Sequence, residues 1–169
     1  MDQIKVRGGV KLNGTIEISG SKNAALPIII GSLLTNRKVV IRRVPDLADV
    51  RTILELLTFF GAKLNLKSDL AGKVVEIENT NITINKAPYE LVRKMRASVL
   101  VLGVLVARYG QAKVSLPGGC AIGTRPIDIH LKGLESLGAS ISLEDGYVKA
   151  IAKKGLVGTE INLPKVSVG

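Results

Sequence analysis

The residues with the clearest chemical potential lie in one short stretch, LPGGCAIGTRPID, which spans residues 116–128. It holds Cys120, the only cysteine of the chain, with glycines at positions 118, 119 and 123 and Arg125 close behind. Glycines let a ligand approach the backbone, and Pro126 suits the first position of a helix whose amides attract anions. A thiol beside an arginine and a helix N-terminus has a lowered pKa. The stretch therefore predicts a reactive thiol near an anion site, although an ordinary glycine turn has a similar composition.

A second candidate site opens an apolar helix at SGSKNAALP, residues 19–27. Ser19 or Ser21 suits the cap of this helix, which places Lys22 and Asn23 in its first turn. A lysine is unfavourable at the positive end of a helix dipole unless an anion lies beside it. Lys22 is therefore either the partner of an anion or a solvated surface residue.

A third basic group precedes an apolar run in YELVRKMRASVLVLG. With a spacing of three residues, Arg93 and Arg96 are expected on one side of a helix, and Arg93 and Lys94 fit a polar face. Arg96 adjoins the apolar half, so we expect it to have a partner or to line a cleft.

The remaining motifs of enzyme chemistry are weak or missing. His130, the only histidine, is expected to be a packed helix residue rather than a catalyst. The sequence has no cluster with metal-ligand spacing, no dinucleotide fingerprint and no P-loop. We therefore expect neither a metal nor an organic cofactor.

Composition predicts a globular protein, with 46% hydrophobic and 22% charged residues in 169. A single cysteine forms no internal disulfide, the first residues resemble no leader peptide, and the apolar runs are too short for a bilayer. These features predict a cytoplasmic protein. The net charge of +10 suggests an anionic partner, either a nucleic acid or a small anion. Only 3% of residues are aromatic, which disfavours base stacking, and pairs such as Arg42-Arg43 and Lys153-Lys154 read as solvated loop charge.

The elements that must position these residues form an internal repeat. Residues 49–66 align with residues 126–143 at a constant offset, and both show helical apolar spacing, a Gly-Ala stop and then a strand. Residues 24–41 likewise align with residues 99–116, as an apolar helix, a turn and a strand. A unit of two helices between short strands is therefore predicted twice.

The repeat also marks where function is expected. Residues 157–169 repeat the pattern of residues 13–25, so a third copy starts near the end of the sequence. The two full copies differ in the loop before the second helix, which is RRVPDLAD in one and PGGCAIGTRP in the other. The extra length and the cysteine occur together, and an elaborated loop on a repeated scaffold favours a functional role over an arbitrary difference.

The motifs SGSKNAALP, MRAS, LPGGCAIGTRPIDIH and PKVSVG, in this order, closely resemble the UDP-N-acetylglucosamine 1-carboxyvinyltransferase family. The resemblance runs from about Ile4 to Gly169. It implies an α/β fold of repeated βαβαββ units, an inside-out barrel with pseudo-threefold symmetry, of which the third unit is missing here. It also implies transfer of the enolpyruvyl group of phosphoenolpyruvate to the 3-hydroxyl of UDP-N-acetylglucosamine, the first committed step of peptidoglycan synthesis. Through the cell wall, this step bears on cell shape and division.

The resemblance also implies a role for each motif. Cys120 matches the family's proton donor, while Lys22 and Asn23 match residues that bind phosphoenolpyruvate. Arg96 matches an arginine near the amino sugar. Two further stretches match the nucleotide-binding segments, and Arg125 also faces phosphate; these stretches are Arg125, Pro126, Ile127, Asp128 and Ile129, and Lys165, Val166, Ser167 and Val168.

The family is more than twice as long as this chain, so the expectation is a fragment that is inactive alone. Residues 1–21 are expected to be strands of a domain shared with an absent C-terminal half, and residues 22–169 an incomplete second domain. Phosphoenolpyruvate, UDP-N-acetylglucosamine and that absent half are the expected partners, with no nucleic acid or membrane. The alternative is a non-catalytic module on the same scaffold that binds anions or nucleic acid.

Overall fold

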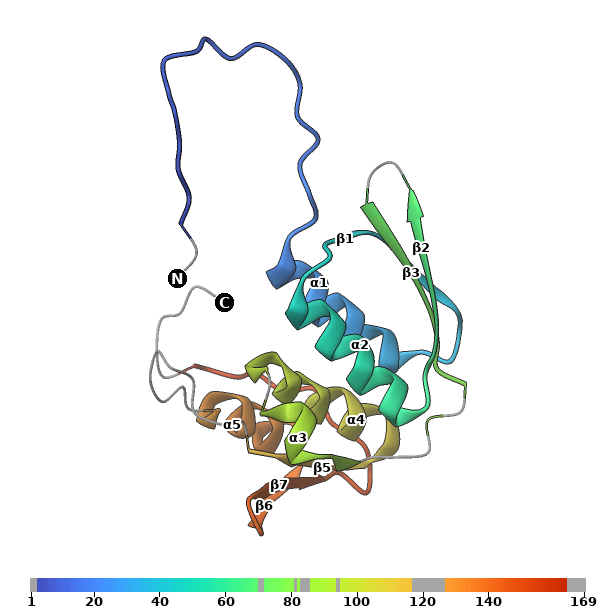
Figure 1. Cartoon of the computed structure of the whole chain (residues 1–169). Helices are drawn as coiled ribbons and strands as arrows, with labels where there is room; N and C mark the ends of the chain where they lie inside the picture. Colours follow the sequence, from blue (N-terminus) through green and yellow to red (C-terminus); the bar gives the residue numbers. More distant parts are fainter. Residues whose placement is uncertain are drawn as a thin grey trace.

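The computed structural model describes residues 3–69, 72–80, 82, 86–93, 95–116 and 127–163. Helices and strands alternate along the chain, after an extended N-terminal arm (Figure 1). The elements, in which η denotes a 3-10 helix, are α1 (Lys22–Gly31), η1 (Ser32–Leu34), β1 (Val39–Val44), α2 (Ala48–Phe60), β2 (Lys63–Asp69), β3 (Gly72–Glu78), β4 (Lys86–Ala87), α3 (Tyr89–Val92), η2 (Arg96–Leu100), α4 (Val101–Tyr109), β5 (Gln111–Ser115), α5 (Asp128–Ser136), β6 (Ser140–Glu144) and β7 (Tyr147–Ile151).

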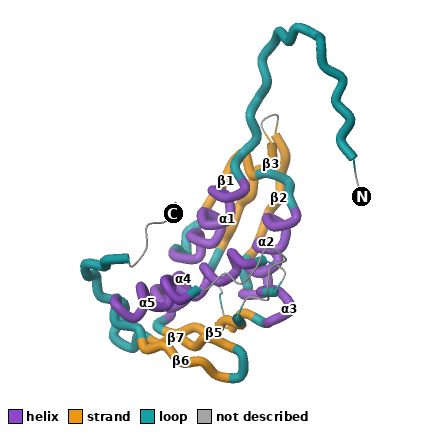
Figure 2. Tube along the Cα trace, turned by 90° about the vertical axis from the view of Figure 1, so that its left-hand side faces the viewer, coloured by secondary structure: helices purple, strands orange, loops and turns teal. Residues whose placement is uncertain are grey.

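Residues 22–78, which we call the first unit, combine two adjacent helices with a three-stranded sheet. The middle strand β3 pairs antiparallel with both β1 and β2, so the two edge strands run parallel to each other. α1 and α2 lie side by side along this sheet (Figures 1 and 2). Alternating apolar residues of β3, among them Val75 and Ile77, are buried under the helices.

Residues 86–151, the second unit, repeat this plan. The strand order β5-β7-β6 corresponds to β1-β3-β2, and the short β4 is added in parallel beside β5. α4 and α5 correspond to α1 and α2 in chain order. The repeat predicted from the sequence is therefore confirmed, including the helix, strand, helix, strand order within each copy.

The two second helices end in the same way, at the predicted Gly-Ala stops. Gly61 and Gly138 both have positive φ, 107° and 93°, a conformation that a residue without Cβ adopts at little cost. The amides of Ala62 and Ala139 donate to the carbonyls of Leu57 and Leu134, both over 3.0 Å. These bonds close the helix end as a glycine cap does.

The helices supply most of the hydrophobic core. Ile29, Leu33 and Leu105 are fully buried, which confirms that the apolar runs of residues 24–34 and 97–107 are core helices, and Phe60 at the end of α2 is fully buried as well. No helix in the described part of the chain is long and apolar enough to cross a membrane.

Arg108 of α4 joins the two units. Its guanidinium donates to the carbonyls of Leu33 and Thr35, at 2.5 and 3.0 Å, and to that of Asn79 at 3.1 Å. The side-chain amide of Asn79 in turn donates to the carbonyl of Ser32 over 2.7 Å. A side chain of the second unit therefore satisfies carbonyls at the C-terminal end of the first apolar helix. A cation at this end also interacts favourably with the helix dipole.

Three expectations need correction or stay open. The helix expected to carry Arg93 and Arg96 on one side is interrupted, because Met95 between them is extended (φ −154°, ψ 126°) and buried, so the two arginines do not share a continuous helical face. Arg42 and Arg43 belong to β1 rather than to a loop. Residues 3–20 run away from the body as an extended arm (Figure 2), and their assignment to another domain stays a prediction.

Candidate functional site

Three of the sequence motifs meet around one hollow of about 350 Å³. One wall is the start of α1, and Asp49 of α2 adds a carboxylate. Another wall is the chain around η2, and the start of α5 completes the lining. The lining residues are Lys22, Asn23, Leu26, Asp49, Met95, Ala97, Val99, Leu100 and His130.

Lys22 is the first residue of α1, as the sequence predicts. The helix begins after Ser21, whose backbone is extended (φ −78°, ψ 128°) and whose carbonyl accepts the amide of Ala25 over 2.9 Å. The position of the cap is thus confirmed, although the Ser21 side chain forms no capping hydrogen bond. Asn23 follows in the same turn and lines the hollow with Lys22.

The Lys22 ammonium group lies 2.7 Å from an oxygen of the Asp49 carboxylate. Both side chains are partly exposed, at 43% and 34%. The carboxylate supplies the anion that the sequence requires beside a lysine at a helix N-terminus. An anionic ligand must therefore take over Lys22 from Asp49, or bind beside the pair.

Arg96 is the first residue of η2, and its neighbours Met95 and Ala97 both line the hollow. The side chain of Arg96 lies outside the part of the structure that is described, so its expected role in a cleft stays a prediction. Arg93, by contrast, pairs with Glu90 at 2.9 Å and lies over the ring of Tyr89, in agreement with a polar surface face.

The start of α5 carries the predicted residues Ile127, Asp128 and Ile129. Ile127 is buried at the N-cap, and its carbonyl accepts the amide of Leu131 over 3.1 Å. Asp128 opens the helix and is exposed, and Ile129 is half-buried. The other predicted site residues, Cys120, Arg125, Pro126, Lys165, Val166, Ser167 and Val168, lie outside the described residues.

Sequence reasoning missed two residues of this hollow. His130 is exposed at its edge, so the expectation of a packed helix residue is wrong. The repeat offered a clue, because the aligned residue in the first copy is the apolar Ile53. Asp49 gave no such clue, since an acidic residue in a first helical turn is common and its partner lies 27 residues earlier.

The arrangement suits a small anion with an apolar part. One ammonium, one carboxylate, one amide and one imidazole face a hollow whose other lining residues are apolar. Within the described residues, no group of three or more His, Cys, Asp and Glu side chains is arranged to hold a metal ion.

Known proteins resemble this chain both in sequence and in structure. The similarity in sequence is described first. The family model described as EPSP synthase (3-phosphoshikimate 1-carboxyvinyltransferase) matches residues 6–169. Two similar relatives, both named UDP-N-acetylglucosamine 1-carboxyvinyltransferase, come from Desulfosudis oleivorans and Sulfurovum sp.. They are 60% identical over 91% of this chain and 50% identical over 100% of it. The chain spans only 36% and 39% of their lengths.

The chain also resembles solved structures in its fold. The enolpyruvyl transferase NikO from Streptomyces tendae has a TM-score of 0.69 at 23% identity, over 89% of this chain and 32% of that one. An EPSP synthase from Acinetobacter baumannii has a TM-score of 0.64 at 19% identity, over 92% of this chain and 35% of that one. These likenesses confirm the expected α/β fold of the enolpyruvyl transferases.

Proposed function

The chain belongs to the EPSP synthase family, and we propose that it forms part of an enzyme that transfers the enolpyruvyl group of phosphoenolpyruvate to the 3-hydroxyl of UDP-N-acetylglucosamine. The acceptor is chosen because two relatives at 50–60% identity are named for it. The reaction would place the protein in peptidoglycan synthesis, in the cytoplasm. The observation that carries the proposal is the meeting of Lys22, Asn23, the start of η2 and the start of α5 around one hollow.

Lys22 binds an anionic oxygen of phosphoenolpyruvate in this proposal. The ligand replaces Asp49, whose carboxylate oxygen lies 2.7 Å from the ammonium group. The N-terminal amides of α1 add a positive potential at the same place. Asn23 offers an amide donor in the same turn, and Arg96, at the start of η2, lies near the amino sugar.

Cys120 supplies the acid. Its thiol protonates the methylene carbon of phosphoenolpyruvate, and the neighbouring carbon gains oxocarbenium character. The sugar hydroxyl attacks this carbon while a base supplied by the absent C-terminal half takes its proton. Lys22 and Arg125 hold the anionic groups through these steps. The tetrahedral adduct then releases phosphate while its new methyl group returns a proton to the Cys120 thiolate, which restores the carbon–carbon double bond and the thiol.

The nucleotide is held by the two remaining stretches. Arg125 to Ile129 and Lys165 to Val168 bind the uridine diphosphate, and Arg125 also contacts phosphate. The charge of both substrates accounts for part of the positive balance of the chain. No step of this mechanism uses a metal or an organic cofactor.

Calorimetric titration tests the proposal on the chain of 169 residues. UDP-N-acetylglucosamine, followed by phosphoenolpyruvate, should release or absorb heat with a saturable curve. Lys22→Ala should weaken phosphoenolpyruvate binding by roughly tenfold, as expected when a charge-assisted hydrogen bond is lost. Lys154→Ala, at an exposed turn, is the matched control and should change nothing. Heat with a DNA duplex alone, steeply weakened by salt, would instead favour the nucleic-acid-binding module.

Activity is tested in two forms of the protein. The chain covers 39% of the Sulfurovum relative, so we expect the 169 residues alone to release phosphate only at the background rate. A chimera that carries this chain in place of the matching segment of that relative should turn over. Cys120→Ala in the chimera should abolish turnover, because the proton donor is lost. A chimera unaffected by Cys120→Ala would refute the assigned mechanism.

The reactivity of Cys120 provides an independent measurement. As the only cysteine, it gives an unambiguous signal when the chain is labelled with iodoacetamide and analysed by mass spectrometry. Labelling near neutral pH should be faster than that of glutathione, because Arg125 and the adjacent helix favour the thiolate. Phosphoenolpyruvate together with UDP-N-acetylglucosamine should slow it. A rate equal to that of glutathione, unchanged by ligands, would make the thiol a bystander.

A further inference from the structure

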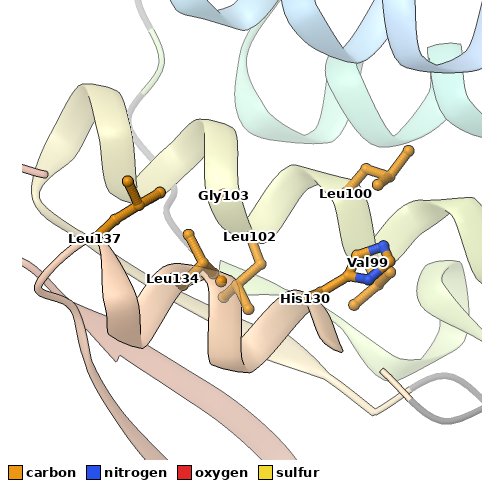
Figure 3. Close-up of a pocket in the computed structure, with 8 residues that line it drawn as sticks. Val99, Leu100, Leu102, Gly103, His130, Leu134 and Leu137 are labelled. Atoms are coloured by element: carbon orange, nitrogen blue, oxygen red, sulfur yellow. The ribbon is translucent and has the colours of Figure 1, made fainter. Parts of the chain in front are cut away.

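His130 lies where two hollows adjoin. It is the third residue of α5 and lines the hollow that holds Lys22 and Asp49. It also lines an apolar groove of about 250 Å³ between α5 and the η2–α4 segment. Figure 3 shows the imidazole at one end of this groove beside Val99, with Leu134 and Leu137 further along. The ring therefore marks the change from apolar to charged lining.

The repeat shows that the scaffold does not need a histidine here. The equivalent residue of α2 is Ile53, which is fully buried in the core of the first unit. His130 is exposed, and no described side chain forms a hydrogen bond or ion pair with its imidazole. Packing explains Ile53, but it does not explain a polar ring at the rim of a charged hollow.

The charged groups around the imidazole come from several elements. α1 contributes Lys22 and α2 contributes Asp49, which are already paired with each other. On α5 itself, Asp128 and Lys132 lie two residues to either side and are exposed. The η2 segment contributes apolar lining, and the side chain of Arg96, its first residue, lies outside the described part. Among the described lining residues, the imidazole is the titratable group without a partner.

We propose that His130 is a substrate-contacting residue of the hollow that holds Lys22, where its imidazole donates a hydrogen bond to a phosphate or carboxylate oxygen of the bound anion. The identity of the anion, phosphoenolpyruvate, rests on the proposed function; the contact rests on the lining of the hollow. A neutral imidazole offers one N–H donor, and a protonated one adds a second donor and a positive charge. An imidazole that is protonated at lower pH therefore binds an anion more tightly than a neutral one.

The experiment uses the only histidine as its own reporter in the full chain of 169 residues. The imidazole resonances are followed by NMR during titration with phosphoenolpyruvate in the presence of UDP-N-acetylglucosamine, and in parallel with inorganic phosphate and with acetate. The imidazole signals should shift to saturation with phosphoenolpyruvate. A response to phosphate alone would assign the contact to the phosphoryl group, and a response to acetate alone would assign it to the carboxylate.

Variants separate binding from packing. His130→Ile restores the residue of the first copy and should weaken phosphoenolpyruvate binding by roughly fivefold to tenfold at about pH 6, the scale of one charge-assisted hydrogen bond. Its melting temperature should stay the same or rise. His130→Gln keeps a donor without the charge, so it should bind nearly as well as the parent at about pH 8 and lose the gain at lower pH. Any titration of the ligand itself affects His130→Gln and the parent equally. The ratio of the parent affinity to the His130→Gln affinity at each pH therefore isolates the contribution of the imidazole.

Lys132 is exposed and lies two positions after His130 on α5. The control variant is Lys132→Ala, which should bind like the parent. If Lys22→Ala weakens binding while both His130 variants match the parent from pH 6 to about pH 8, the His130 contact is wrong and the proposed function stands. If the parent chain binds neither phosphoenolpyruvate nor phosphate, both proposals are overturned.

Discussion

α2 and α5 hold the same place in the two units but have different surroundings. α2 buries six residues, Val50, Ile53, Leu54, Leu56, Leu57 and Phe60, whereas α5 itself buries none. Both have apolar residues at helical spacing and both end at a Gly-Ala stop. The similar patterns therefore form the same local structure with different degrees of burial.

Within these 169 residues, the difference lies in what packs against each helix. α2 lies directly along α1, and its apolar face is completed by that contact. α5 is separated from part of α4 by the apolar groove, and its first turn borders the hollow that holds Lys22. A helix that contributes little to the core can carry polar residues such as His130 at small cost in stability.

The largest expected effect tests this comparison directly, with two identical residues at equivalent positions. Leu57→Ala should destabilise the protein by about 3 kcal/mol, because Leu57 is fully buried and the substitution leaves a cavity. Leu134→Ala should cost about 1 kcal/mol or less, because Leu134 is only half-buried at the groove. Urea unfolding measures both. Equal losses would show that α5 is packed as tightly as α2.

The second prediction concerns the link between the units. Arg108→Met should destabilise the protein by about 2 kcal/mol, because the carbonyls of Leu33, Thr35 and Asn79 lose a charged donor. Arg93→Met, which breaks an exposed pair with Glu90, should cost only a few tenths of a kcal/mol. Thermal unfolding compares them. If the two variants melt alike, the units are held together by the apolar core alone.

The third prediction sharpens the contrast between the starts of the two units. A Cβ on Gly20 would lie 1.8 Å from the carbonyl oxygen of Arg43, a backbone atom in β1. Gly20→Ala should therefore shift the start of α1 and cost about 1–2 kcal/mol. Gly31→Ala, with open space around its Cβ, should be neutral or slightly stabilising. If the alignment of residues 24–41 with 99–116 is extended, Gly20 corresponds to Met95, which has a side chain. A Gly20→Ala protein as stable as the parent would contradict this close approach.

The smallest effect is expected from the acidic residues on the two sheets. Hydrogen bonds from Lys38, Lys67 and Asn65 lower the pKa of Glu76 to about 2, although burial opposes them. Lys149, Ser142 and Lys113 lower the pKa of Glu144. A carboxylate with a lowered pKa in the folded state stabilises the fold above its unfolded-state pKa of about 4.3, and this contribution is lost as the pH falls toward 2.

The Glu76→Gln and Glu144→Gln variants compare the two sheets. Each variant should lose stability at neutral pH and approach the parent in acid, because only the parent has a charge to lose there. Each carboxylate pairs with two lysines, but the effect should be larger at Glu76, whose side chain is only 14% exposed, against 41% for Glu144. Unfolding followed by circular dichroism between about pH 2 and pH 7 covers the window of this linkage. If the free energy of unfolding of a variant has the same pH dependence as that of the parent, the ion pairs of that carboxylate contribute nothing.

Local sequence patterns specify the repeated elements and their ends. Apolar residues at helical spacing, the Gly-Ala stops of residues 61–62 and 138–139 and the serine before Lys22 act over one or two helical turns. Such patterns depend on neighbours in the chain, so they can be recognised without knowledge of the tertiary fold. The motifs carried the resemblance to the transferase family for the same reason, since the spacing within each motif is local.

Which of these residues face one another depends on long-range packing. The Lys22–Asp49 pair joins residues 27 positions apart, and Arg108 contacts a carbonyl 75 positions away. His130 was wrongly predicted to be packed, because its exposure depends on tertiary contacts and an equivalent sequence position does not guarantee an equivalent environment. Whether a helical face is buried depends on which elements close over it, and the structure leaves the start of α5 open beside the charged hollow.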